Sequence, residues 1–197
     1  MKIIKIDSFK QPEYVHQIAQ VYKDVFEGDP WYQVCKCPVC DQTYPSNSGL
    51  CKNCEADGKL INLIEYWPIS KIIADLYKQM SKKNSLSFVA IHNETIVGFS
   101  WGHEVSVDKD LDTYLGAPGL HKYLDKETHF YLDEIGVITS YQGKGIGKEL
   151  VNKIFTHQRA KKVILKTLKD SQMYKMIEKM GGKTVLHVPG TQVIMSL

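Results

Sequence analysis

The stretch from Tyr131 to Phe155, YLDEIGVITSYQGKGIGKELVNKIF, decides the fold. It opens inside a β-rich run, residues 129–138, that predicts a strand, and it closes on a segment whose apolar residues share one side of a helix. Between the two lies Gln142–Gly147, which reads QGKGIG. The sequence therefore predicts a strand, a glycine-rich turn and a helix in succession.

The glycine-rich turn has the chemistry of an anion site. Glycine lets the backbone adopt positive φ and approach a ligand closely, and the first N–H groups of the following helix have no partner inside that helix. Partial positive charge gathers at a helix start, which favours a pyrophosphate group there, and Lys144 and Lys148 add cations beside it. An ordinary tight connection between a strand and a helix would also use glycines, so the turn alone leaves both interpretations open.

Periodicity predicts the elements around this turn. Further strands are expected over residues 2–7, 85–92, 95–105, 161–168, 183–188 and 191–197, and further helices over residues 12–28, 69–80 and 171–180. Asn93 and Glu94 separate two of the strands and suit a tight hairpin, and residues 107–127 predict a loop or a broken helix. The glycine turn thus follows the fourth strand, whereas a nicotinamide-type dinucleotide fingerprint would follow the first.

In this setting the pattern Q-x-x-G-x-G, present as QGKGIG after YLDEIGV and ahead of KELVNKIF, resembles the acetyl-CoA signature of the GNAT superfamily. The resemblance covers nearly the whole chain apart from residues 32–60. It implies an α/β (α+β) fold with a mixed β-sheet that is splayed between its fourth and fifth strands, where the pantetheine arm of acetyl-CoA lies. The residues that it implies for acetyl-CoA binding are Val137, Thr139, Gln142, Gly143, Lys144, Gly145, Ile146, Gly147 and Lys148.

Two adjacent carboxylates precede the turn and are candidates for proton transfer. Acyl transfer needs a neutral amine, yet a primary amine has a pKa of about 10.4, so some group must take a proton. The superfamily often carries a carboxylate nine residues before the motif, which is Asp133 here. Strand alternation predicts that Asp133 and Glu134 point to opposite faces, so only one serves the site unless a bulge reverses the parity. The alternative is that either carboxylate is an ordinary strand residue.

A general acid for the leaving thiolate is harder to assign. Family members often use a tyrosine four residues before the glycine that ends the last helix, and that position is Ile177 here. Tyr174 lies one turn earlier and is the candidate substitute, although it could equally pack in the core.

The cysteines predict a metal site. Cys37 and Cys40 form one C-x2-C pair and Cys51 and Cys54 another, with ten residues between the pairs. Two such pairs supply the four thiolates of a closed, structural Zn²⁺ site, so residues 32–60 resemble a zinc ribbon inserted between the first two helices. The fifth cysteine, Cys35, is left over, although it could replace Cys37 as a metal ligand. The alternative to a metal site is a group of five unligated thiols. The insertion is expected to border the acceptor site.

Composition sets the remaining expectations. The chain is 43% hydrophobic and 24% charged with a net charge of +3, which indicates one globular domain over residues 1–197 and disfavours nucleic acid as a partner. In the cysteine segment the lysines do not outnumber the acidic residues, which is poor for phosphate binding. No signal-peptide pattern or membrane span is visible, so a cytoplasmic location is expected. The sequence does not indicate an oligomeric state.

The predicted function is therefore acetyl transfer from acetyl-CoA to a primary amine of a small molecule or a protein. The alternative is an acetyl-CoA-binding module with little transferase activity, whose zinc ribbon docks protein or nucleic acid. No motif names the acceptor. Residues that could line its pocket are Trp31, Trp101, His103, Glu104, His121 and His129.

Overall fold

The computed structural model describes residues 1–7, 11–46, 49–160, 162–169, 171–188 and 190–197. Residue 161, the first of the strand expected over residues 161–168, lies outside this description.

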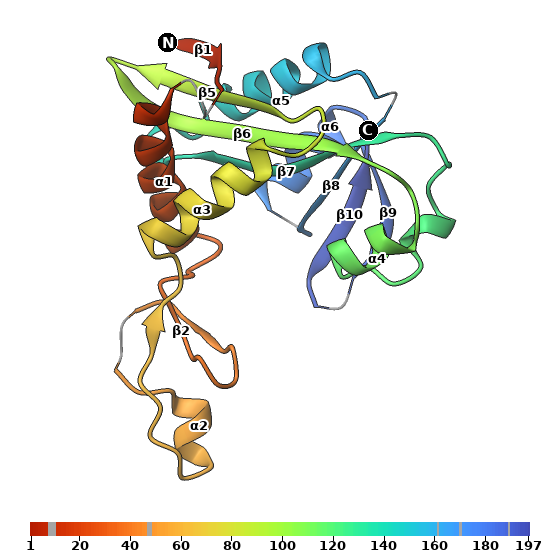
Figure 1. Cartoon of the computed structure of the whole chain (residues 1–197). Coiled ribbons are helices and arrows are strands. Elements are labelled where there is room, and N and C mark those ends of the chain that lie inside the picture. The colour runs from red at the N-terminus through yellow and green to blue at the C-terminus, as the bar shows by residue number, and fades with distance from the viewer. Residues whose placement is uncertain (8–10, 47–48, 161, 170, 189) are drawn as a thin grey trace.

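One seven-stranded sheet forms the centre of the molecule (Figure 1). Its strands, in the spatial order β1-β5-β6-β7-β8-β10-β9, are β1 (Lys2–Lys5), β5 (Leu86–His92), β6 (Thr95–Val105), β7 (His129–Val137), β8 (Lys162–Leu168), β10 (Gln192–Ser196) and β9 (Lys183–His187). All pairs are antiparallel except β7 and β8. The sheet is therefore mixed, as the resemblance implied.

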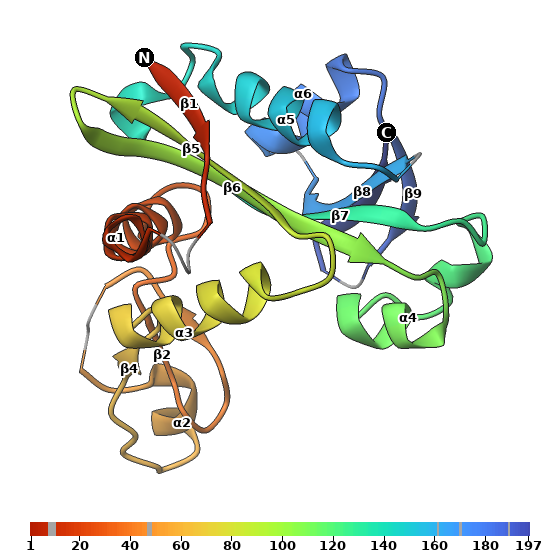
Figure 2. The ribbon, with the colours of Figure 1, turned by 45° about the horizontal axis from the view of Figure 1, so that its top comes forward.

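Helices cover both faces of this sheet (Figure 2). The longer ones are α1 (Pro12–Glu27), α3 (Ile69–Met80), α5 (Ile146–His157) and α6 (Gln172–Lys179), and the shorter ones are α4 (Lys109–Leu115), η1 (Leu120–Lys122) and η2 (Thr139–Tyr141). The apolar stripes of α1 and α3 pack on one face, and those of α5 and α6 pack on the other. The two faces thus have separate cores.

The sheet splays between β7 and β8. These parallel strands pair only from His129 opposite Lys162 to Leu132 opposite Leu165. Beyond that point β7 stays paired with β6 as far as Val137, while β8 stays paired with β10. The predicted splay at the fourth and fifth strands of the main sheet is confirmed.

Local signals account for two of the connections. Asn93 and Glu94 join β5 to β6 with φ angles of 48° and 63°, which is the left-handed backbone of a two-residue hairpin. In the 107–127 region, the Asp108 side chain caps α4 by accepting from the amides of Asp110 and Leu111, and Gly116 ends the helix in the left-handed conformation. The broken-helix interpretation of this region is the one the structure shows.

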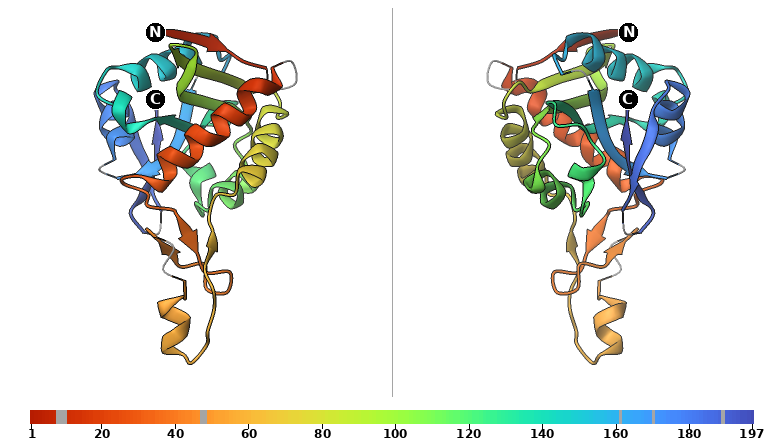
Figure 3. Two further views of the ribbon diagram at one scale, coloured as in Figure 1. Left: turned by 90° about the vertical axis from the view of Figure 1, so that its left-hand side faces the viewer. Right: turned by 90° about the vertical axis from the view of Figure 1, so that its right-hand side faces the viewer.

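A small unit that we call the cysteine module projects from the end of α1 (Figure 3). It contains β2 (Cys35–Lys36), β3 (Thr43–Tyr44), α2 (Lys52–Ala56) and β4 (Ile64–Glu65), and its sheet has the order β3-β2-β4. In the chain it lies between α1 and α3, as predicted. It extends beyond residue 60, the expected end of the insertion, because β4 belongs to its sheet. Among the described residues, no helix combines the length and apolar character that a bilayer crossing requires.

Candidate functional site

The turn between β7 and α5 presents a row of free backbone amides. Gly143 and Gly145 adopt φ angles of 73° and 84°, and Gly145 immediately precedes α5. Within the described part of the chain, none of the amides of residues 143–148 donates a hydrogen bond. Since α5 also directs its positive end here, the turn fits a pyrophosphate group.

The side chains of the same segment divide between packing and solvent. Ile146 is buried in the core, so only its amide is offered to a ligand. The Gln142 amide group donates to the Val137 carbonyl at 2.9 Å, and the Lys144 ammonium donates to the Ser140 carbonyl at 3.0 Å. Residues Thr139, Gln142, Gly143, Lys144, Gly145 and Lys148 are exposed. Six of the nine candidate acetyl-CoA residues are therefore accessible beside the open end of the splay.

A β-bulge in β7 brings both candidate carboxylates to the same face of the sheet. Trp101 of β6 pairs with Glu134, and the next residue, Gly102, pairs with Leu132, so Asp133 is the extra residue. The bulge reverses the alternation beyond it. Our expectation of opposite faces, which assumed regular alternation, is wrong in this structure: Asp133 and Glu134 line one cavity.

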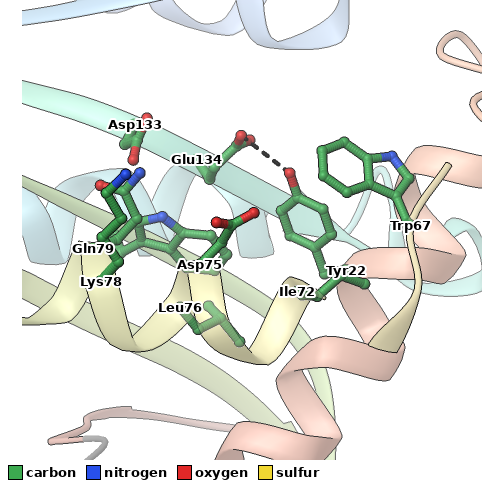
Figure 4. A pocket seen from close by; sticks show the side chains of 10 residues that line it. Tyr22, Trp67, Ile72, Asp75, Leu76, Lys78, Gln79, Asp133 and Glu134 are labelled. Atoms are coloured by element: carbon green, nitrogen blue, oxygen red, sulfur yellow. Dashed lines mark hydrogen bonds between the residues drawn. The ribbon is translucent and has the colours of Figure 1, made fainter. Parts of the chain in front are cut away.

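That cavity has a volume of about 210 Å³ and lies on the face covered by α1 and α3 (Figure 4). Its wall combines aromatic and acidic side chains with one lysine: Tyr22, Trp67, Ile72, Asp75, Leu76, Lys78, Gln79, Trp101, Asp133 and Glu134. Aromatic faces and carboxylates both attract cations, so the cavity suits an organic ammonium group.

Glu134 is held by a tyrosine from α1. The Tyr22 hydroxyl donates to Oε1 of Glu134 at 3.3 Å (Figure 4). Tyr22 is buried among rings, and it stacks on Phe99 at 5.7 Å and on Trp101 at 5.8 Å between ring centroids. Removal from water and the neighbouring Asp133 charge raise the pKa of Glu134 to about 8, although the Tyr22 bond opposes the rise. A carboxylate with such a pKa can exchange protons near neutral pH.

Asp133 experiences a different environment. Burial raises its pKa to about 6, and the Lys82 ammonium limits the rise. Because the two carboxylates are adjacent and repel each other, Asp133 ionises first and leaves Glu134 as the more basic group.

Tyr174 is not part of this cavity. It lies in the first turn of α6 and packs, partly buried, against the core beneath α5, on the other face of the sheet. Its backbone amide is bound to the Ser171 hydroxyl at 3.0 Å. Its assignment as a general acid stays a prediction.

Of the six residues considered for the acceptor pocket, Trp101 alone lines the cavity. The others make contacts elsewhere: Trp31 with Phe26, His103 with Tyr131, Glu104 with Asn84, His121 with Asp112 and His129 with the Glu127 carbonyl. Conversely, the sequence did not single out Tyr22, Trp67 or Asp75. Each belongs to a segment far from the glycine motif, and no local pattern marks it.

The four cysteines of the two C-x2-C pairs converge. The sulfur atoms of Cys37, Cys40, Cys51 and Cys54 all lie within 4.8 Å of one another, with 3.7 Å between Cys37 and Cys54 and 3.6 Å between Cys40 and Cys51. These distances exceed that of a disulfide bond. They match the ~3.8 Å edge of a tetrahedron with Zn–S bonds of about 2.3 Å. Cys35 is buried but outside the cluster, so the cluster contains the predicted four.

Comparisons with known proteins fit this arrangement. A sequence model of the acetyltransferase (GNAT) family matches residues 59–181, which is more than half of the chain. No curated protein gives a significant match. The structure is similar to that of an aminoglycoside 6'-acetyltransferase type Ii, with 16% identity and a TM-score of 0.57 over 100% of this chain and 96% of that one.

Two further solved structures share the fold. One is described as histone acetyltransferase HPA2 and related acetyltransferase from Corynebacterium glutamicum, with 17% identity and a TM-score of 0.59 over 99% of this chain and 94% of that one. The other is Arabidopsis thaliana NAA60 with a bisubstrate analogue, with 14% identity and a TM-score of 0.54 over 100% and 97% of the two chains. The structural likenesses show the fold, and the sequence match shows the family: the chain belongs to the GNAT family of acetyltransferases.

Proposed function

We propose that this protein transfers the acetyl group of acetyl-CoA to a primary amine that binds in the cavity beside Asp133 and Glu134. The observation that carries the proposal is the bulge in β7, because it places two carboxylates of raised pKa in one cavity next to the splay. The family membership supports acetyl-CoA as the donor, and Arabidopsis thaliana NAA60, which shares the fold, has been solved with acetyl-CoA.

Acetyl-CoA would be held by the amides of residues 143–148, by Lys144 and Lys148, and by backbone groups near Val137 and Thr139. When bound, it supplies an acetyl group activated as a thioester. The free amides and the positive end of the α5 helix would stabilise the negative charge of the pyrophosphate group.

The residues of the cavity would prepare the amine. An alkyl ammonium enters with its proton because its pKa is about 10.4. Asp75, Asp133 and Glu134 attract this cation, and the ionised Glu134 accepts a proton from it. The neutral nitrogen then forms the new C–N bond as the C–S bond breaks, and its second proton passes to the cavity's carboxylates or to water. Tyr22 fixes the direction of the Glu134 carboxylate throughout.

The acceptor is an amine of a small molecule or of a protein. The cavity has a volume of about 210 Å³, and the exposed Asp75 lies at its wall. It can therefore enclose a compact amine or the end of a lysine side chain, while a larger acceptor must extend past Asp75 toward solvent.

We also propose that Cys37, Cys40, Cys51 and Cys54 hold a structural Zn²⁺. Four thiolates complete its shell and leave no position for substrate, so the ion takes no part in the transfer. The expected result of metal analysis after gentle purification is about one zinc per chain.

The test of the function combines thermal shift with acetyl-CoA and thiol release over a panel of primary amines. The proposal expects stabilisation by acetyl-CoA and release of free CoA that depends on the amine. Stabilisation without turnover of any amine would instead favour a binding module.

A further inference from the structure

The two segments that enter and leave the cysteine module pair with each other where it joins the main domain. Cys35 lies opposite Glu65 and Lys36 opposite Ile64 in the antiparallel ladder of β2 and β4. The ladder continues past the strand ends, because the Tyr66 amide donates to the Val34 carbonyl at 3.0 Å. The position of Trp67, the next residue, therefore follows from the register of this ladder.

Gln33 connects the module to Trp67 through a side-chain hydrogen bond. The indole Nε1 of Trp67 donates to Oε1 of Gln33 at 3.0 Å. The backbone amide of Gln33 in turn donates to the carbonyl of Phe26, near the end of α1, at 2.9 Å. Gln33 is thus fixed on the main domain by its backbone and holds the indole by its side chain.

The Trp67 ring is part of the cavity wall (Figure 4). Its ring packs edge-on against Tyr22, with centroids 5.0 Å apart and an interplanar angle of 81°. Tyr22 carries the hydrogen bond to Glu134. The Lys71 ammonium lies 5.0 Å from the Trp67 ring centroid. One side chain therefore links the base of the module to the wall that an acceptor would touch.

The module has little apolar material with which to hold this register by itself. Its buried cluster consists of Cys37, Cys51 and Cys54, with the partly buried Tyr44, Ile61 and Leu63 around it. A unit of this size does not fold on so small a core without a further constraint. Binding of a metal ion by the four thiolates would supply that constraint.

From these contacts we infer that Trp67 is a specificity-determining residue for the amine, that Gln33 is its positioning residue, and that the metal-bound cysteine module keeps the pair in place. The inference rests on the proposed function for its kinetic consequence alone. Its structural consequence is that, when the metal is lost, the β2–β4 ladder opens more readily and the Trp67 side chain is no longer held in place.

Donor binding should be independent of the module. The amides of the glycine turn lie at the start of α5, which covers the opposite face of the sheet from α3 (Figure 2). The inference therefore predicts a separation: disturbance of the module weakens acceptor binding and leaves acetyl-CoA binding unchanged.

The first experiment measures steady-state kinetics with whichever panel amine is turned over fastest. Trp67→Phe and Gln33→Leu should each raise the KM for the amine about threefold to tenfold, the effect of one lost hydrogen bond, with kcat little changed. Gln33→Glu retains an acceptor oxygen for the indole, so the KM of this variant should stay at the wild-type value. Equal losses in kcat for all three variants, with KM unchanged, would overturn the assignment.

The second experiment does not depend on activity. Hydrogen–deuterium exchange is compared between the wild-type protein, Cys40→Ser, which removes one thiolate of the four, and Cys35→Ala, which alters the cysteine outside the cluster. Cys40→Ser should lose zinc and exchange faster across β2, β4 and Trp67, with β7 and α5 unchanged and the thermal shift with acetyl-CoA retained. Cys35→Ala should keep its zinc and its protection.

The outcomes separate the two proposals. If no amine is turned over, the proposed function fails and the kinetic part of the inference fails with it, while exchange still decides whether the metal-bound module holds Trp67 in place. If the wild-type protein contains no metal, or if Cys40→Ser loses zinc without faster exchange at β4 and Trp67, the inference is wrong.

Discussion

The Tyr22 hydroxyl donates a hydrogen bond to Oε1 of Glu134 at 3.3 Å, joining α1 to the bulged strand β7 across 112 positions of the chain. This bond favours the ionised carboxylate and so lowers the pKa of Glu134, against the burial and the Asp133 charge that raise it. Tyr22 therefore lowers the pH at which Glu134 can accept a proton, against the larger effect of burial.

Replacement of Tyr22 by phenylalanine should shift the pH dependence to higher pH. Loss of the hydrogen bond raises the pKa of Glu134 further, by about one unit for a bond to a charged group. The rising limb of the plot of kcat/KM against pH should therefore shift to higher pH, so that activity falls at pH 7 and recovers in alkaline buffer. Tyr14→Phe, a change on the same helix, serves as the control and should leave the profile unchanged. An unshifted limb in Tyr22→Phe would exclude this role.

Asp133→Asn should move the same limb in the opposite direction. The negative charge of Asp133 raises the pKa of Glu134, so its removal lowers that pKa and ionises Glu134 at lower pH. The rise of kcat/KM with pH then occurs at lower pH. If Asp133 is itself the proton acceptor, the variant will instead lose at least tenfold in turnover at every pH. The profile thus distinguishes the two carboxylates.

Glu134→Gln should stabilise the protein in alkaline solution. A carboxyl group whose pKa rises from 4.5 to about 8 on folding contributes stability below pH 4.5, and that contribution is lost as the pH rises toward 8. The neutral glutamine avoids this loss and can still accept from Tyr22. We expect the Tm of Glu134→Gln to exceed the wild-type Tm by about 2–4 °C or more at pH 9, and the two Tm values to differ little at pH 5. Equal Tm differences at both values would show that Glu134 does not titrate in this range.

Much of the fold was accessible from the sequence because its signals are local. The glycines at Gln142–Gly147, the apolar stripe of α5 and the turn at Asn93 and Glu94 each act within a few residues. The C-x2-C spacing likewise fixed which four thiols converge. Asp108, a capping residue, and Gly116, a left-handed glycine, are local signals that mark the two ends of α4.

The candidate site depends on relationships that no local pattern encodes. The bulge at Asp133 is a mismatch in register between β6 and β7, and nothing in YLDEIGV signals it. Tyr22 reaches Glu134 because α1 packs across the sheet. Trp67, which follows the β2–β4 ladder in the chain, lines the same cavity from a segment far from the glycine motif. Such packing is decided by the whole fold, and Trp67 also packs directly on Tyr22 and Phe26 of α1.

The glycine turn allows a matched pair of alanine variants. Gly145 has a φ of 84° with open space around it, so alanine there strains the backbone without a clash. Gly147 is helical, and an added Cβ would make an ordinary contact of 3.8 Å with Met176. Calorimetry with acetyl-CoA should show a Kd raised about tenfold in Gly145→Ala and much less in Gly147→Ala, since a strain of about 1 kcal/mol or more displaces the amides. The reverse order would contradict the placement of the pyrophosphate.

The most direct test is a coupled measurement of free CoA and acetylated amine over the amine panel, for the wild-type protein and for Glu134→Ala and Asp133→Ala. We expect equal amounts of both products from the wild-type protein and at least a tenfold lower rate in one or both variants, since a positioned proton acceptor usually contributes about 100-fold or more. Near-wild-type rates in both variants, or acetyl-CoA binding without any acetylated amine, would contradict this expectation.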